Sequence, residues 1–151
     1  QKYVNGSFDL KYEDLVPGVA ELKNTAKING SDWVQTYRYQ NRENEAYHYY
    51  ITEHSFGNNE FKVMINYDIF YITTGTYNFT PSNITNSVKV SKFDVSTGTM
   101  INYNTTGTLT INQREGNIIS GNYNLTAVNP NNSSDVVQVN QGVFKLVNKL
   151  F

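Results

Sequence analysis

The sequence predicts an all-β protein, either an antiparallel β-sandwich or a flattened β-barrel of about ten strands, rich in meanders. Runs rich in β-branched and aromatic residues alternate apolar and polar positions with a period of two, the pattern of strands with one buried face. Short turn sequences separate these runs. A sheet of this size protects its edges by closing or doubling on itself. We expect one domain, with residues 1–24 as an N-terminal strand and link and residues 25–151 as the core.

The first third of the chain contains one strong hairpin signal, the Asn29-Gly30 pair between residues 25–28 and 33–39. In the returning strand we expect Trp33, Gln35, Tyr37 and Tyr39 to share one face. A strand at residues 4–12 is expected to precede this hairpin. Residues 41–45, the most charged stretch, are expected to form an exposed loop.

The middle of the chain contains the cleanest amphipathic strand of the first half. Its apolar positions are Phe61, Val63, Ile65 and Tyr67. A strand over residues 47–53 precedes it, and a strand over residues 68–79 follows it and stops at Pro81. Residues 87–95 and 99–104 are expected to pair across the turn Ser96-Thr97-Gly98.

A three-stranded meander is predicted to close the chain from Gly107 onward, with Gly116 at a positive φ in its first hairpin. In the last strand the apolar positions change parity. A bulge near Gln141-Gly142 would bring all of its core candidates to one face: Val137, Val139, Phe144 and Leu146. The alternative is that this strand is buried on both faces.

A Gly-x-aromatic-x-apolar pattern recurs at Gly6, Gly75, Gly121 and Gly142. The spacings are too uneven for a repeat architecture. The structural interpretation is that each glycine opens a strand and an aromatic ring covers the gap it leaves. The alternative is a duplicated ligand site.

Composition excludes several classes of function. The formal net charge is −1, so there is no basic surplus for nucleic acid, and the absence of cysteine excludes disulfides and thiolate chemistry. No apolar run is long enough for a transmembrane segment. The two histidines, His48 and His54, would lie roughly 20 Å apart on one strand, too far to share a metal ion. There is no nucleophile elbow. We expect no enzymatic activity, no cofactor and no metal.

Aromatic residues carry the strongest functional signal. They crowd into residues 33–50 beside two arginines, and an exposed group of rings can stack on sugars or anchor a protein partner. The alternative is that the rings only pair across strands within the sheet. The candidate binding residues are Trp33, Tyr37, Arg38, Tyr39, Tyr47, Tyr49 and Tyr50.

The stretch from Ala26 to Trp33 fits Ala-x-Ile-Asn-Gly-x-x-Trp, and the C-terminal meander contains Ile-Ser-Gly-x-aromatic and then Gly-x-Phe. In these motifs the chain, over residues 25–147, resembles a family of small uncharacterised exported lipoproteins of Bacteroidota. The resemblance implies an all-β domain at the outer membrane, periplasmic or on the cell surface, or secreted. A lipid anchor would lie upstream of Gln1.

The function expected from these observations is that of a non-enzymatic accessory protein. It would dock onto a larger outer-membrane or cell-surface protein complex. The alternative is a module that binds a carbohydrate or another small ligand through its aromatic residues.

Overall fold

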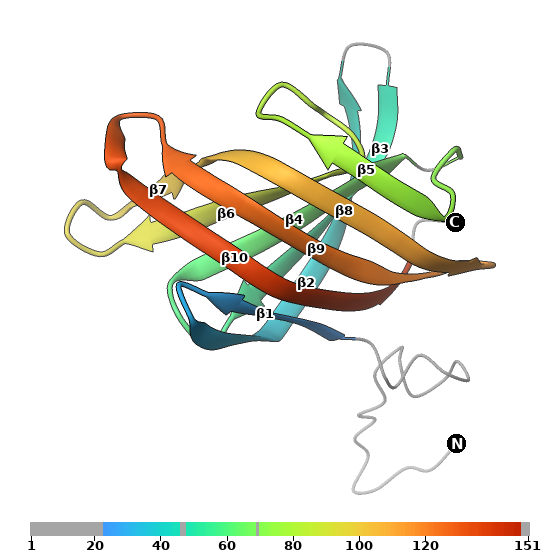
Figure 1. Ribbon diagram of the computed structural model, residues 1–151, viewed down its shortest axis with the longest axis horizontal. Coiled ribbons are helices and arrows are strands. Elements are labelled where there is room, and N and C mark those ends of the chain that lie inside the picture. The colour runs from blue at the N-terminus through green and yellow to red at the C-terminus, as the bar shows by residue number, and fades with distance from the viewer. Residues whose placement is uncertain (1–22, 46–47, 69, 149–151) are drawn as a thin grey trace, which may run out of the picture.

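The computed structural model describes residues 23–45, 48–68 and 70–148, which form one antiparallel sheet of ten strands (Figure 1). The order of strands across the sheet is β5-β8-β9-β10-β1-β2-β3-β4-β6-β7. Among the described residues, no helix is long and apolar enough to cross a membrane. The strands are β1 (Lys23–Ile28), β2 (Ser31–Glu45), β3 (His48–Gly57), β4 (Phe61–Asp68), β5 (Gly75–Phe79), β6 (Ser87–Asp94), β7 (Thr99–Asn102), β8 (Asn104–Glu115), β9 (Ile118–Asn129) and β10 (Asn132–Val147).

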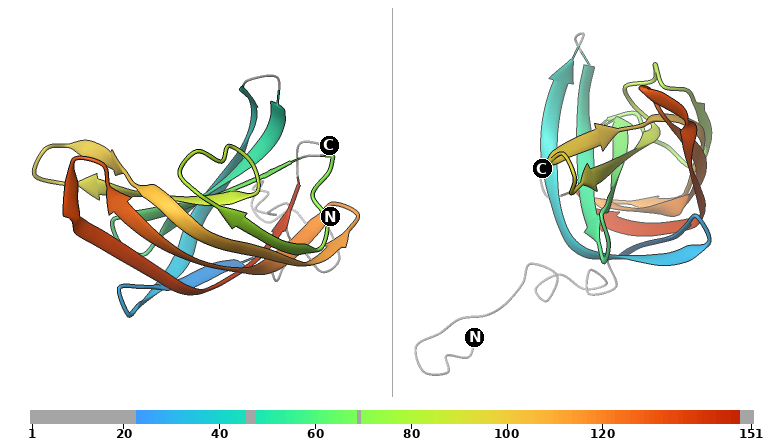
Figure 2. Two further views of the ribbon diagram at one scale, coloured as in Figure 1. Left: turned by 45° about the horizontal axis from the view of Figure 1, so that its top comes forward. Right: turned by 90° about the vertical axis from the view of Figure 1, so that its left-hand side faces the viewer.

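The sheet curls until β8, next to one edge strand, meets β6, next to the other, so the strands surround a single core (Figure 2). At the meeting point the Tyr103 N–H donates to the Val90 carbonyl at 3.1 Å, and the Thr105 hydroxyl donates to the Val88 carbonyl at 2.7 Å. Opposite this seam, β10 pairs with β1, which joins the C-terminal meander to the first hairpin. The predicted all-β class and antiparallel strand pairing are confirmed, and the one curled sheet is closer to a flattened barrel than to two stacked sheets.

The interior is filled by alternate side chains of every major strand, as the period of two predicts. The apolar face of β4 is buried as expected. The largest fully buried side chains are Trp33, Tyr67, Tyr123, Phe79, Phe144, Ile51, Ile65, Ile72, Leu109, Ile111 and Ile119.

The predicted bulge in the last strand is confirmed. The pairing of β10 with β9 shifts register between Val139 and Gly142, and Gln141 takes a positive φ of 53°. The extra residue brings Val137, Val139, Phe144 and Leu146 to the core face, where all four are buried.

The structural interpretation of the recurring pattern holds at Gly142, where an aromatic ring fills the space beside the glycine, but not at Gly75, which has open space around it; Gly6 lies outside the described residues. A β-carbon at Gly142 would lie 2.4 Å from the ring of Tyr123, its cross-strand neighbour. One at Gly121 would lie 1.8 Å from the Thr110 carbonyl oxygen and 3.1 Å from the Phe144 ring. These positions therefore need glycine for close approach.

Two predicted boundaries are wrong. Residues 41–45 are not a loop but the end of β2, because this charged arm pairs with β3 in a hairpin that projects beyond the rest of the sheet (Figure 1). There both faces meet water, so no apolar alternation is needed. Residues 70–74 form a turn, and β5 starts only at Gly75. The strand predicted over residues 4–12 lies outside the described residues.

Candidate functional site

A register shift in β2 divides the predicted aromatic group into an inner and an outer part. The pairing of β2 with β3 shifts register between Gln35 and Tyr37. Odd-numbered side chains therefore point inward before this shift and outward after it. Trp33 points inward, is 0% exposed and donates its indole N–H to the Phe61 carbonyl at 3.2 Å. The prediction that Trp33 shares a face with Tyr37 and Tyr39, as part of an exposed platform, is therefore wrong.

The outer part forms a compact group of rings that we call the aromatic trio: Tyr37, Tyr39 and Phe56. Their ring centroids are 6.2, 6.0 and 5.9 Å apart, and Phe56 is the cross-strand neighbour of Tyr37. Tyr37 is 61% exposed and Tyr39 is 36% exposed. The trio thus presents aromatic surface to solvent on the outer face of β2 and β3.

Lys62 of β4 adds a positive charge to the trio. Its ammonium lies 5.0 Å from the Phe56 ring centroid and 5.9 Å from that of Tyr39, which are cation–π distances. Partial burial lowers the pKa of Lys62.

His54 lies behind Tyr39, with the two rings stacked at 4.3 Å and only 10° from parallel. Its Nε2 is 3.4 Å from the Asn41 amide nitrogen. Burial, helped by the nearby Lys62 charge, lowers the pKa of His54 to about 4. The imidazole is therefore neutral at physiological pH and serves as a supporting surface for the Tyr39 ring.

The remaining predicted site residues do not join the trio. Tyr49 is half exposed on the projecting hairpin, with the Arg42 guanidinium 5.8 Å from its ring centroid. Tyr50 is buried, and Tyr47 lies outside the described residues. Arg38 points to the inner face, so it does not contribute charge to the outer surface.

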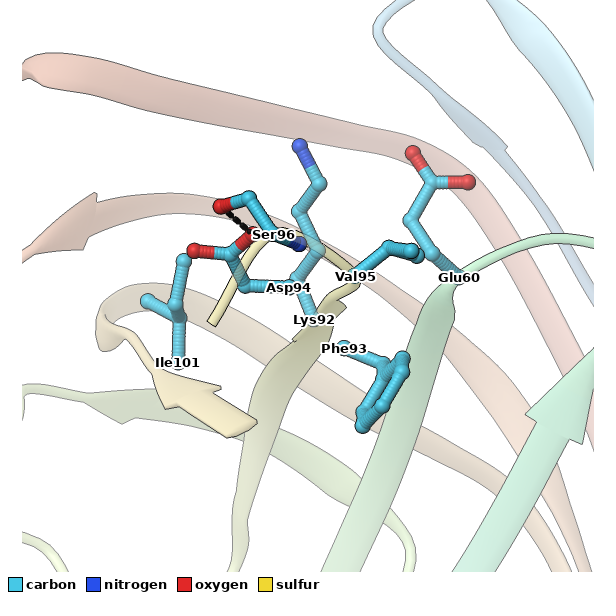
Figure 3. A pocket seen from close by; sticks show the side chains of 7 residues that line it. All are labelled: Glu60, Lys92, Phe93, Asp94, Val95, Ser96 and Ile101. Atoms are coloured by element: carbon cyan, nitrogen blue, oxygen red, sulfur yellow. Dashed lines mark hydrogen bonds between the residues drawn. The ribbon is translucent and has the colours of Figure 1, made fainter. Parts of the chain in front are cut away.

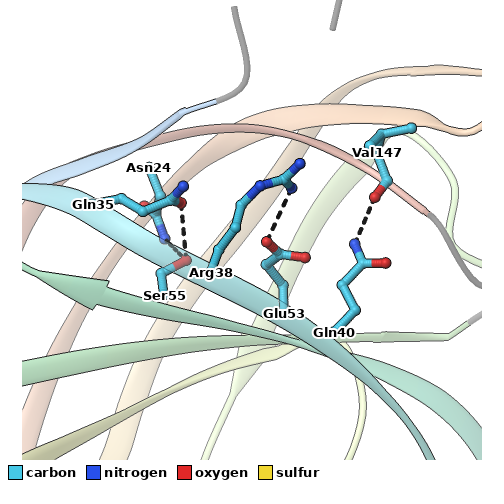
Figure 4. Close-up of polar contacts among 7 residues, drawn as sticks. All are labelled: Asn24, Gln35, Arg38, Gln40, Glu53, Ser55 and Val147. Atoms are coloured by element: carbon cyan, nitrogen blue, oxygen red, sulfur yellow. Dashed lines mark hydrogen bonds and ion pairs between the residues drawn. The ribbon is translucent and has the colours of Figure 1, made fainter. Parts of the chain in front are cut away.

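Arg38 belongs instead to a row of polar side chains inside the sheet (Figure 4). Its guanidinium donates to Glu53 at 3.1 Å, and both side chains are largely buried. The Gln40 amide donates to the Val147 carbonyl at 2.6 Å. Toward β1, the Ser55 hydroxyl joins Gln35 and Asn24, and Asn24 accepts from the Tyr123 hydroxyl at 2.6 Å. These contacts connect β1, β2, β3, β9 and β10 across the interior.

A cleft of about 390 Å³ at the β6–β7 hairpin is the other candidate site (Figure 3). One of its acidic groups, Asp94, accepts hydrogen bonds from the Ser96 hydroxyl and backbone N–H at 2.6 and 2.9 Å, which lower the pKa of Asp94 and hold it in the turn. Glu60 and Lys92 also line the cleft. The lowered pKa makes Asp94 a weak base for the Ser96 hydroxyl beside it, so this contact is that of a turn. Among the described residues, no cluster of three metal-ligating side chains occurs.

Two members of the outer surface, Phe56 and Lys62, were not predicted. The signal for Lys62 was present, because it alternates with the core positions Phe61 and Val63 and so must face outward. Its position opposite Phe56 depends on the pairing of β3 with β4, which the sequence does not state.

Comparison with known proteins adds no relative: no family model matches the chain, and no curated protein or solved structure is significantly similar to it.

Proposed function

We propose that this chain is a non-enzymatic exported accessory protein that docks onto a larger outer-membrane or cell-surface assembly through the aromatic trio. The observation that supports docking is a group of three adjoining rings on the outside of the sheet, of which Tyr37 and Tyr39 are exposed and Phe56 is half-buried. Isolated apolar side chains are common on protein surfaces, but a contiguous aromatic group beside a cation has the composition of an interface anchor.

The trio is also held in place before any partner arrives. Tyr39 is stacked on His54, and Phe56 lies under the Lys62 ammonium. Rings fixed in this way lose little conformational freedom on binding, so more of the contact energy becomes affinity.

Two titratable side chains of β3 support a structural role, one on the inner face and one on the outer face. Glu53 is engaged by Arg38, and His54 remains neutral under Tyr39. The location at the outer membrane is supported by the resemblance of the Ala26–Trp33 stretch and the C-terminal meander to exported lipoproteins.

Site-specific photo-crosslinking in the native host tests the proposal. A photoreactive amino acid at Tyr37 is expected to give a discrete adduct with one membrane or surface protein. The same group at Asn124, exposed on the opposite outer face of β9, is the matched control and should give none. Absence of an adduct at position 37, or the same adducts at both positions, would contradict docking through the trio.

A carbohydrate ligand is the second candidate, and the exposure of the Tyr37 ring, which lies next to Phe56, favours it. Trp33 is buried and cannot report such binding, so Tyr37→Trp should be used as the fluorescent reporter. Saturable emission shifts with soluble glycans, without any protein adduct, would favour the carbohydrate module.

A further inference from the structure

Two lysines lie next to each other on the outer face that carries the aromatic trio. Lys62 of β4 pairs across the sheet with Ser91 of β6, and Lys89 of β6 pairs with Met64 of β4. The two lysines are therefore diagonal neighbours on adjoining strands, roughly 7–8 Å apart. Each lysine alternates with buried core residues along its strand, so both side chains point outward.

Neither ammonium has a carboxylate within ion-pair distance in the part of the chain that the structure describes. The Lys89 ammonium donates to the Pro81 carbonyl at 3.2 Å. The Lys62 ammonium lies over the rings of Phe56 and Tyr39. Partial burial lowers the pKa of both lysines, as expected for cations that have lost some of their water without gaining an anion.

The acidic residues of this outer face are directed elsewhere. Glu60 precedes Lys62 by two residues, but it lines the cleft at the β6–β7 hairpin together with Lys92. Asp68 lies six residues further along β4, roughly 20 Å away, and accepts from backbone N–H groups of the turn that follows. Glu43 is on the projecting arm of β2. The surface beside the trio thus carries two positive charges and no bonded anion.

This arrangement limits the kind of partner that can cover the trio. A partner that packs on the rings also removes water from the Lys62 ammonium, which lies over two of them. Burying a cation without an anion is costly, whereas a carboxylate placed against it turns the same loss of water into a stronger attraction. A purely apolar or basic partner surface therefore fits poorly here, and an acidic one fits well.

We propose that the segment of the partner protein that docks on the trio is acidic. A carboxylate of an aspartate or glutamate side chain lies between Lys62 and Lys89, and an apolar side chain beside it packs on Tyr37. This partner chemistry rests on the docking proposed above. Complementary charges of this kind speed association and select among partners, while the rings supply contact area.

Charge removal, read through the photo-crosslink at position 37 in the native host, tests the proposal. The double variant Lys62→Gln/Lys89→Gln is expected to lower the adduct yield about tenfold, and Lys62→Arg/Lys89→Arg, which keeps both charges, should restore it. Lys89→Gln alone should already lower the yield, although its ammonium is held by a carbonyl and not by a ring of the trio.

The matched control is Lys92→Gln. The Lys92 ammonium also lies over an aromatic ring, that of Phe61 at 5.6 Å, but Lys92 pairs with this core residue and so faces the other side of the sheet. The adduct yield of this variant should equal that of the wild type.

Carbodiimide coupling tests where the carboxylate lies, because it joins an activated carboxyl group to a lysine amine in direct contact. The partner that is trapped at position 37 should also be coupled to Lys62 or Lys89 through one of its aspartates or glutamates, as identified by mass spectrometry of the joined peptides. The Lys62→Arg/Lys89→Arg variant has no amine at these positions, so it should lose this coupling and keep the photo-adduct.

The outcomes separate this inference from docking itself. A photo-adduct whose yield is the same in wild type and Lys62→Gln/Lys89→Gln, or is the same at about 50 mM and about 500 mM salt, would overturn the acidic partner and leave docking intact. Absence of any photo-adduct would contradict docking.

The purified chain is tested separately with poly-L-glutamate as the probe. Binding that is lost in Lys62→Gln/Lys89→Gln and kept in Lys92→Gln is expected, and absence of such binding would overturn the inference whether or not docking holds. Tighter binding of polygalacturonate, an acidic polysaccharide, without any protein adduct would assign the two lysines to a glycan and would overturn it as well.

Discussion

Two glycines leave the space in which large buried rings of this protein lie. Gly57 pairs with Gln35 beside the indole of Trp33, and a β-carbon there would lie 1.9 Å from the indole nitrogen. Gly142 has the same relation to Tyr123. The rings occupy space that the side chain of any other residue at these positions would need.

Replacement of Gly57 by alanine is therefore expected to lower the free energy of unfolding by roughly 1–3 kcal/mol, since the methyl group must displace a buried ring. Gly116→Asn is the control, because Gly116 has a φ of 58° and open space around it, and asparagine tolerates that conformation. Urea denaturation measures both. Equal losses would show that the Trp33 contact is unimportant.

His54 makes stability depend on pH in a predictable direction. The unfolded chain binds a proton at this residue near pH 6.5, whereas the folded chain does so only near its pKa of about 4. The free energy of unfolding therefore falls as the pH drops from about 6.5 to 4, because the unfolded state takes up the extra proton. His54→Gln should remove this component, seen as a smaller drop in urea midpoint between pH 7 and pH 4.5. Parallel curves for both proteins would contradict it.

A bulge could be predicted from the sequence where the apolar residues of a strand switch between odd and even positions. It could not be predicted in a strand rich in tyrosine. In β10, valines followed by Phe144 and Leu146 reveal the bulge, because only one register buries them all. In β2, tyrosine suits either face, so the slip after Gln35 leaves no such sign and Trp33 was misplaced. Tyr37 and Tyr39 were candidates from the sequence, but their grouping with Phe56 and Lys62 depends on strand pairing.

The β10 bulge is testable through Gln141, a non-glycine residue with φ of 53°. Gln141→Gly should raise the free energy of unfolding by about 1 kcal/mol, because glycine adopts this conformation without steric cost. Gln141→Val should lower it by at least as much, since a β-branched residue is strained there. Urea midpoints give both values. A stabilising valine would show that position 141 is not held in the left-handed region.

The closed form of the molecule depends on contacts between distant parts of the chain. β1 pairs with β10, and the polar row from Gln35 through Ser55 and Asn24 to Tyr123 crosses the interior. On the other side, β8 meets β6 through bonds at Tyr103 and Thr105. Local patterns predict the strands but carry no information on which ends meet, so the sequence left sandwich and barrel open.

The seam between β6 and β8 is expected to be sensitive to one hydroxyl. Thr105 is fully buried and donates to the Val88 carbonyl at 2.7 Å, so Thr105→Val keeps the shape but leaves that carbonyl without this bond. We expect a loss of about 1–2 kcal/mol in the free energy of unfolding. The neighbouring Thr106 is exposed, and Thr106→Val should change the free energy of unfolding by less than about 0.5 kcal/mol.

Amide hydrogen exchange gives the local readout: the Tyr103 N–H, bonded to Val90, should exchange faster in Thr105→Val than in Thr106→Val. Unchanged protection at Tyr103 would mean that the seam is held by the packed core alone, since the hydroxyl is then not needed to keep the two ends of the sheet together.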